Sequence, residues 1–185
     1  MRDFEYIKMQ KLHCRKSIRL KNYDYSSNGY YFVTICVQNR EKLFGEIVGA
    51  TLCGRPNNPD KIITKWLLEL ENKFNDIKID EYIIMPNHIH FIIKRMGEHT
   101  GSPLRDKIGW FKTMTTNEYI AGVKSGKFIP FKGRLWQRNY YEHIIRNYDD
   151  YINIAEYIQN NPLKWEYDKL FVSEGKYGSK KKERG

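Results

Sequence analysis

Two histidines, His88 and His90, stand one residue apart in the otherwise apolar segment MPNHIHFII. Alternate side chains of a β-strand point to the same face, so both imidazoles would share one face while Ile89 and Phe91 enter the core. Strand geometry places the two Cβ atoms ~7 Å apart, a distance that imidazoles can close on one divalent cation or one phosphate. Histidines are also common as packing or surface residues, so a metal site here requires a third ligand.

A second candidate group lies in the segment AEYIQNNP, where Tyr157 precedes Asn161 by four residues. On a helix this spacing places the phenol and the carboxamide on one face. Tyrosine is a poor nucleophile at its ordinary pKa of about 10, so its attack on a phosphodiester requires a cation or a base nearby. His88 and His90 would hold that cation. The alternative for Tyr157 is ordinary packing of an amphipathic helix.

The segments around these residues predict the elements that position them. Apolar patterns predict strands over residues 30–38, 76–85, 88–95 and 135–145, the last of which runs into a turn. Amphipathic spacing predicts helices over residues 60–74, 102–122 and 147–162. Their expected boundary residues are Asp60, Ser102 with Pro103, Gly122 and Pro162. The Gly-, Asn- and Pro-rich segment 48–60 is expected to be a loop.

The order of these elements is typical of a split β-α-β arrangement. We therefore expect an α+β fold, a ferredoxin-like or RRM-like antiparallel sheet with helices packed on one face. A hairpin over residues 76–95 would turn at Pro86-Asn87 and bring the histidines to the start of a strand. Along the chain we expect a basic arm over residues 1–28, one domain over 29–170 and a basic flexible tail over 171–185.

Charge favours an anionic partner. The 32 Lys and Arg residues outnumber the 22 Asp and Glu residues, which gives a formal net charge of +10 and a pI near 9.4. Fourteen tyrosines among these cations favour nucleic acid, because aromatic rings stack on unpaired bases. The three cysteines show no CxxC spacing, and the sequence lacks a signal peptide or an apolar run long enough to span a membrane. We therefore expect a reduced, cytoplasmic protein with no membrane partner.

Two groups of basic residues are candidates for DNA binding. The first combines cations and aromatic rings in the N-terminal segment and consists of Arg15, Lys16, Arg19, Lys21, Tyr23 and Tyr25. The second precedes the last helix and consists of Lys124, Lys127, Lys132, Arg134 and Arg138. In such groups the cations contact phosphates and the rings contact unpaired bases. The alternative for the N-terminal group is an ordinary solvated basic segment.

Three segments, MPNHIHFII, RLWQRNYYEHIIRN and AEYIQNNPLKW, resemble the REP-associated tyrosine transposases. This family is a branch of the IS200-like, single-tyrosine HUH transposases, in which HUH stands for His-hydrophobic-His. The resemblance covers roughly residues 15 to 166. It places the catalytic tyrosine of the family on Tyr157 and its metal-facing residues on His88, His90 and Asn161.

The middle segment matches further family positions whose chemical roles the resemblance does not give. They are Trp136, Gln137, Arg138, Glu142, His143 and Arg146. For His143, orientation of a ligand, contact with DNA and packing at the start of a helix all remain open.

The resemblance also implies a reaction. Members of the family cleave and rejoin single-stranded DNA next to short hairpins. Attack by Tyr157 on a phosphorus would leave a 5′-phosphotyrosine link and a free 3′-OH, with Mg²⁺ or Mn²⁺ at the phosphate and no nucleotide cofactor. A monomer is favoured over a homodimer.

Two other functions remain open from the sequence. A nucleic-acid-binding module without catalysis would use the aromatic residues of the strand YYFVTICV on an RRM-like sheet. A replication or conjugation nickase would share the histidine pair. Nickases of that type are usually longer, and they often place the tyrosine before the histidines.

Overall fold

The computed structural model describes residues 27–48, 51–53, 59–97 and 102–172. Its centre is a four-stranded antiparallel sheet in the order β4-β5-β1-β6. The strands are β1 (Gly29–Cys36), β4 (Ile77–Met85), β5 (His88–Arg95) and β6 (Tyr141–Ile145). This is the strand order of a ferredoxin-like split β-α-β fold, so the expected α+β class and the expected hairpin are confirmed.

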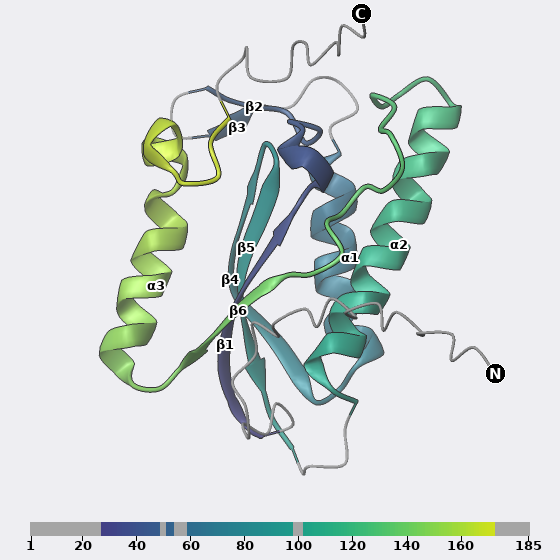
Figure 1. The fold of residues 1–185 in the computed structure, drawn as a ribbon. Coiled ribbons are helices and arrows are strands. Elements are labelled where there is room, and N and C mark those ends of the chain that lie inside the picture. Colours follow the sequence, from purple (N-terminus) through teal and green to yellow (C-terminus); the bar gives the residue numbers. More distant parts are fainter. Residues whose placement is uncertain (1–26, 49–50, 54–58, 98–101, 173–185) are drawn as a thin grey trace, which may run out of the picture.

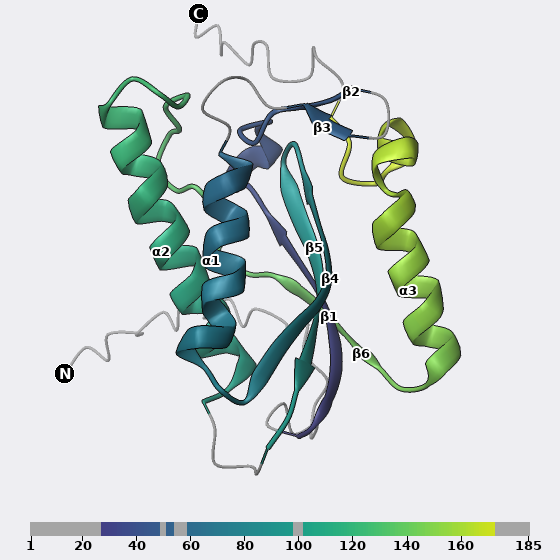
Figure 2. The same cartoon turned by 180° about the vertical axis from the view of Figure 1, so that it is seen from behind.

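The helices are divided between the two faces of this sheet (Figure 1). Helices α1 (Asp60–Lys73) and α2 (Leu104–Lys124) pack side by side on one face. Helix α3 (Tyr148–Asn160) covers the opposite face, as the view from behind also shows (Figure 2). The sheet is therefore enclosed between two helical layers, and not all of its helices lie on one face.

Side chains of β1 alternate between two apolar cores. Tyr31 and Val33 are fully buried in the larger core, between the sheet and the layer of α1 and α2. Phe32 points the other way, into a smaller core that it shares with Ile92 and with Ile158 of α3. Burial on both faces explains why the sequence of β1 lacks the polar alternation of an exposed strand.

The turn between β4 and β5 is tied to the rest of the molecule at Asn87. This residue is fully buried, and its side-chain amide donates hydrogen bonds to the backbone oxygens of Arg40 and Leu170, at 3.2 and 2.9 Å. In the strand register that follows, His88 lies opposite Cys36 and His90 opposite Thr34. The hairpin thus places both histidines beside the C-terminal end of β1.

Several boundaries differ from those expected. Part of the segment predicted as a loop forms a small second sheet of β2 (Glu46–Val48) and β3 (Thr51–Cys53). The strand predicted over 135–145 is confined to β6, and Trp136 makes only an isolated bridge with Val37. The backbone of Pro103 caps α2 without a side-chain hydrogen bond from Ser102, and Gly122 lies inside the helix. Short 3-10 helices follow β1, as η1 (Gln38–Arg40), and α3, as η2 (Pro162–Tyr167).

The N-terminal candidate residues for DNA binding, from Arg15 to Tyr25, lie outside the described residues, as do residues 173–185 of the expected tail. No helix in the described part of the chain is both long and apolar enough to cross a membrane.

Candidate active site

The two histidines of β5 point to the face that α3 covers, and both are buried. Their Nε2 atoms lie 2.9 Å apart, and their ring centroids are separated by 4.4 Å. Ile89 and Phe91 point the opposite way and are fully buried in the larger core. The alternation predicted for this strand therefore holds, and the two imidazoles converge on one point.

Hydrogen bonds on the far side of each ring orient the imidazoles. Because both amide protons of Asn87 are directed at backbone carbonyls, its Oδ1 accepts, and His88 Nδ1 donates to it at 2.8 Å. His88 Nε2 therefore presents a lone pair to the site. His90 Nδ1 lies 2.8 Å from Thr34 Oγ1, which can donate or accept. Such partners fix the orientation of metal-binding imidazoles.

Burial also keeps both rings neutral. Desolvation lowers the pKa of His88 well below 6.5, and the neighbouring His90 lowers it further. Desolvation lowers the pKa of His90 to about 4, although the carboxylate of Asp168 acts in the opposite direction. Neutral imidazole is the form that binds a metal ion, so both rings can act as metal ligands at neutral pH without first losing a proton.

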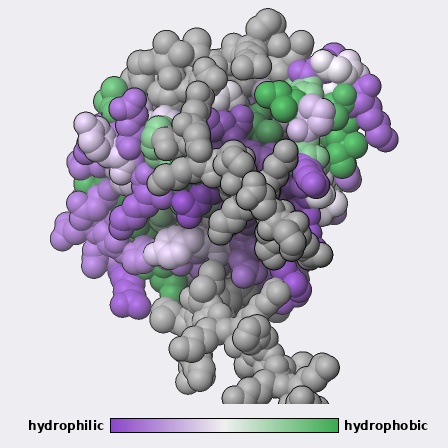
Figure 3. All heavy atoms as spheres, turned by 45° about the horizontal axis from the view of Figure 1, so that its top comes forward, coloured by the Kyte–Doolittle hydropathy of each residue, from purple (hydrophilic) through white to green (hydrophobic). Residues whose placement is uncertain are grey.

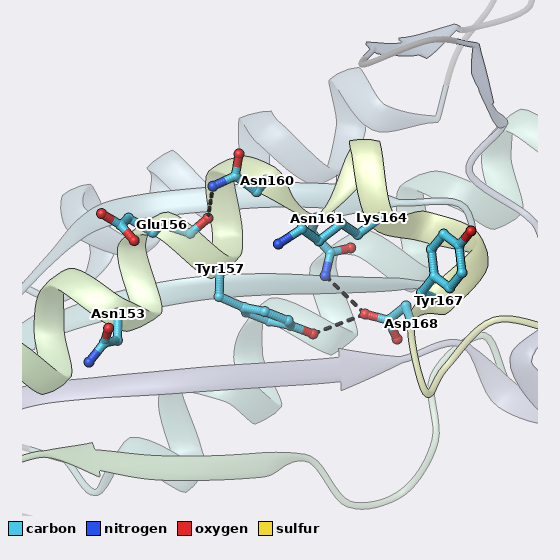
Figure 4. A pocket seen from close by; sticks show the side chains of 8 residues that line it. All are labelled: Asn153, Glu156, Tyr157, Asn160, Asn161, Lys164, Tyr167 and Asp168. Carbon is cyan, nitrogen blue, oxygen red and sulfur yellow. Dashed lines mark hydrogen bonds between the residues drawn. The ribbon is translucent and has the colours of Figure 1, made fainter.

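Tyr157 reaches this point from α3. Its ring packs edge-on against Phe32, and its hydroxyl lies 3.3 Å from His90 Nε2. The hydroxyl donates to Asp168 Oδ2 at 2.9 Å (Figure 4). Burial and the nearby carboxylate raise the pKa of Tyr157 above its ordinary value. The phenol is therefore protonated at neutral pH and requires a positive charge nearby to act as a nucleophile.

Asn161, the residue after α3, also faces the site. Its Nδ2 donates to Asp168 Oδ2 at 2.9 Å, and the side chain is buried. Its Oδ1 is buried and has no hydrogen-bond partner among the described residues. A buried carbonyl oxygen without a partner is unfavourable, and a cation bound there would satisfy it.

Asp168 is the residue that sequence reasoning missed. Ligand atoms of His88, His90 and Asp168 all lie within 4.8 Å of one another. Asp168 follows η2, just past the end of the resembling segments, and no local motif marks it. The only signal in the sequence is a carboxylate soon after the helix that bears the tyrosine. The carboxylate of Asp168, Asn161 Oδ1 and two neutral imidazoles together form a donor set that fits a divalent cation.

The remaining motif residues make hydrogen bonds in other parts of the fold. Trp136 Nε1 donates to Thr115 Oγ1 at 2.8 Å in the larger core, and the backbone and side-chain amides of Gln137 donate to carbonyls of Cys36 and Val37. His143 Nε2 lies 2.9 Å from Asp150 Oδ2 at the start of α3.

That hydrogen bond agrees with the helix-start role considered for His143. The backbone amide of Arg146 donates to the same carboxylate, at 3.3 Å. Glu142 is half-buried on the other face of β6. Among the described residues, the hydrogen bonds of Trp136, Gln137 and His143 lead to groups other than the histidine pair.

The side chains of Arg134 and Arg138 are exposed, as a contact with DNA requires. Lys112, beneath this segment, donates to the backbone oxygens of Gln137, Arg138 and Asn139 at 3.0 to 3.4 Å, which fixes the loop. Most of the coloured surface in Figure 3 is hydrophilic, and hydrophobic side chains form small separate groups. All five residues of the second basic group are exposed, and their contact with DNA stays a prediction.

The family model described as Transposase IS200 like matches residues 25–161. Because this match covers most of the chain, the chain belongs to the IS200-like transposase family, and the protein is an enzyme that acts on DNA. The membership expected from the three sequence segments is confirmed.

Individual relatives agree with this assignment. The chain is 39% identical over 173 residues to an uncharacterized protein of Haemophilus influenzae, and the alignment covers 87% of this chain and 95% of that protein. It is 25% identical over 159 residues to another protein of that organism, provisionally named a REP-associated tyrosine transposase, with 80% and 79% covered.

A solved structure has the same fold. The structure of a REP-associated tyrosine transposase bound to a REP hairpin matches with a TM-score of 0.55 at 20% identity, over 82% of this chain and 76% of that one. At this identity the likeness shows the fold alone.

Proposed function

We propose that this transposase cleaves and rejoins single-stranded DNA next to hairpins, with Tyr157 as the nucleophile and a 5′-phosphotyrosine as the intermediate. One observation carries the proposal. The hydroxyl of Tyr157 lies 3.3 Å from His90 Nε2 and 2.9 Å from Asp168 Oδ2, beside the imidazole pair and the buried Oδ1 of Asn161, which has no hydrogen-bond partner among the described residues.

In the proposed reaction the phenolic oxygen of Tyr157 forms a bond to phosphorus, and the bond from phosphorus to the 3′ oxygen breaks. Asp168 is placed to accept the phenolic proton, since the hydroxyl already donates to it. The departing 3′ oxygen takes a proton from solvent. Rejoining is the reverse step, in which a 3′-OH attacks the phosphotyrosine and Tyr157 recovers its proton.

Four groups would hold the divalent cation: the Nε2 atoms of His88 and His90, Asn161 Oδ1 and the carboxylate of Asp168. Bound there, the cation would polarise the scissile phosphate and offset the charge that develops in the transition state. Mixed nitrogen and oxygen donors suit Mn²⁺ better than Mg²⁺, which prefers oxygen ligands.

The choice of hairpin DNA rests on the relatives. One relative carries the name of a REP-associated tyrosine transposase, and the solved neighbour is bound to a REP hairpin. The net charge of +10 favours any nucleic-acid partner.

The structure disfavours the binding module that the sequence left open. An RRM-like reader stacks bases on aromatic side chains of an open sheet face. Here Tyr31 is fully buried beneath α1 and α2, and Phe32 is buried beneath α3. Within the described residues, both faces of the sheet are covered by helices, so these rings are not available to bases.

The geometry also supports action by a single chain. Tyr157 reaches His90 of its own chain, at 3.3 Å from hydroxyl to Nε2. This contact within one chain supports delivery of the tyrosine without a partner subunit, and the monomer stays a prediction.

The test is an incubation of purified protein with end-labelled single-stranded hairpin oligonucleotides and Mn²⁺ or Mg²⁺. We expect a protein–DNA adduct that survives denaturation with the wild-type protein. Tyr157→Phe should abolish the adduct while retaining DNA binding, because the phenyl ring keeps the packing and lacks the nucleophile. His88→Ala should also abolish it, because the remaining ligands are too few.

Tyr148→Phe is the matched control, since Tyr148 lies on the same helix and is 73% exposed. It should form the adduct at the wild-type rate. Tight binding without any adduct across a range of hairpins and both metals would refute the proposal in favour of a binding module.

A further inference from the structure

A pocket of about 320 Å³ opens beside Tyr157, on the outer side of the residues that form the site (Figure 4). Most of its lining comes from one stripe of α3 that continues into η2, with residues three or four positions apart. The stripe consists of Asn153, Glu156, Tyr157, Asn160, Asn161 and Lys164. Tyr167 and Asp168 close the end of the pocket.

This stripe is distinct from the one that holds α3 on the sheet. The packing stripe includes Ile154 and Ile158, which contact the smaller core. The pocket stripe is rich in asparagine, a residue that is unfavourable inside helices because its amide competes for backbone hydrogen bonds. The C-cap position accounts for Asn161 but not for Asn153. The side-chain amide of Asn160 donates a hydrogen bond to the backbone oxygen of Glu156.

The pocket and the proposed nucleophile share residues. Tyr157 and Asp168 line the pocket, and the hydroxyl of Tyr157 lies 2.9 Å from Asp168 Oδ2. A phosphate placed for attack by this hydroxyl therefore has its adjoining nucleotide within reach of the pocket. The volume lies at the lower end of the ~300–1,000 Å³ that is usual for small-ligand sites, which suits one base rather than a paired stem.

The chemistry of the lining matches a nucleobase. Carboxamides offer a donor and an acceptor together, as the edges of bases do. Tyr167 is 88% exposed, so its ring is free of the core and available for stacking. Figure 4 shows the ammonium group of Lys164 beside Asn161, directed toward Asn160, where it supplies a cation for the strand's phosphate, whereas Glu156 disfavours a phosphate farther along α3.

We propose that this pocket binds one unpaired base of the DNA strand, the base that adjoins the phosphate attacked by Tyr157. The inference rests on the proposed function, because it takes the position of the scissile phosphate from it. The pocket would contact the DNA strand next to the scissile phosphate, and this contact is separate from any recognition of the hairpin.

The test first determines the cleavage position on the DNA strand with the wild-type protein. It then uses the Tyr157→Phe protein, which is expected to leave the strand uncleaved. The fluorescent base 2-aminopurine is placed at each position that flanks the cut. We expect binding to quench its fluorescence at one position, and Tyr167→Ala to remove the quenching. Tyr148→Ala, at an exposed tyrosine of α3 outside the pocket, should leave the quenching unchanged.

A second comparison replaces the same nucleotide by an abasic residue. The abasic strand should bind about tenfold more weakly than the complete strand, as loss of one stacked base predicts. Tyr167→Ala and Asn160→Ala should weaken binding of the complete strand and have no further effect on the abasic strand. Gln159→Ala, at the neighbouring exposed position outside the pocket, should bind both strands as the wild type does.

The outcomes separate the two proposals. If the wild-type protein forms the adduct but the pocket variants bind and quench like their controls, the pocket inference alone is overturned. If the wild-type protein forms no adduct with any hairpin, the proposed function fails, and the pocket inference fails with it.

Discussion

At the scale of single residues, the histidine pair depends on two polar neighbours that bond the Nδ1 atoms of the rings, on the side away from the paired Nε2 atoms. Asn87 accepts a hydrogen bond from His88 Nδ1, and its own protons are held by two backbone carbonyls. Thr34 lies 2.8 Å from His90 Nδ1. The second contact is less constrained, because a hydroxyl can donate or accept, and it can follow the tautomer that His90 adopts when a cation binds.

Replacing Thr34 by valine keeps the shape of the side chain and removes the hydroxyl. We expect the Mn²⁺ concentration for half-maximal adduct formation to rise about 10- to 100-fold, because such partners orient metal-binding imidazoles. Thr113→Val is the matched control, since Thr113 is exposed on α2 and its hydroxyl donates to the backbone oxygen of Gly109. An unchanged metal dependence for Thr34→Val would mean that β5 orients His90 without this bond.

At the scale of elements, α3 delivers the tyrosine, and contacts near its start fix where it lies. Asn147 caps its first turn by accepting a hydrogen bond from the amide of Asp150, at 2.8 Å. The carboxylate of Asp150 contacts His143 of β6 at 2.9 Å, and the hydroxyl of Tyr151 donates to Asp80 of β4 at 2.7 Å. The helix is thus tied to both edge strands of the sheet before it reaches Tyr157.

The end of α2 offers a test of packing at the same scale. Gly122 is buried inside the helix, and a Cβ atom there would overlap the ring of Phe128. Gly122→Ala should therefore lower the free energy of unfolding by about 1–3 kcal/mol, measured by urea denaturation. In Gly109→Ala, on the same helix, the new Cβ meets nothing within 4 Å, so stability should rise by up to about 1 kcal/mol. Equal effects of the two changes would contradict this account.

At the scale of the whole molecule, the site lies between the sheet and α3, and its burial has a cost in stability at low pH. The folded state holds both histidines neutral, with pKa values lowered by desolvation, to about 4 for His90. The unfolded chain binds protons at these residues with a pKa near 6.5. Between these pH values the unfolded state holds more protons, so the free energy of unfolding rises with pH and falls as pH drops below 6.5.

We expect this loss in metal-free protein, measured by urea denaturation with a chelator present from pH 7 to pH 4. His90 alone should contribute about 3 kcal/mol, since each pKa unit corresponds to about 1.4 kcal/mol. His90→Gln removes the titrating group, so its stability should fall less steeply than that of the wild type. Parallel curves for the two proteins would show that His90 is protonated in the folded state as readily as in the unfolded state.

The sequence by itself determined β1, β4, β5 and the three α-helices, though not β2, β3 or the extent of β6. It also determined the turn before His88 and the shared face of the two imidazoles. These features follow from local spacing, because the period of apolar residues sets both the type of element and the side that is buried. The sequence also placed Tyr157 and Asn161 on one helix face. Resemblance to a family, rather than periodicity, connected them to the histidines.

Only the tertiary structure decided which face of the sheet α3 would cover and which further group would complete the site. Both cores are apolar, and α3 packs on the smaller one, on the face opposite α1 and α2. Asp168 lies far from His88 in the chain and meets it only because η2 turns the chain back toward β5. A contact between such distant residues depends on packing, which local spacing does not encode.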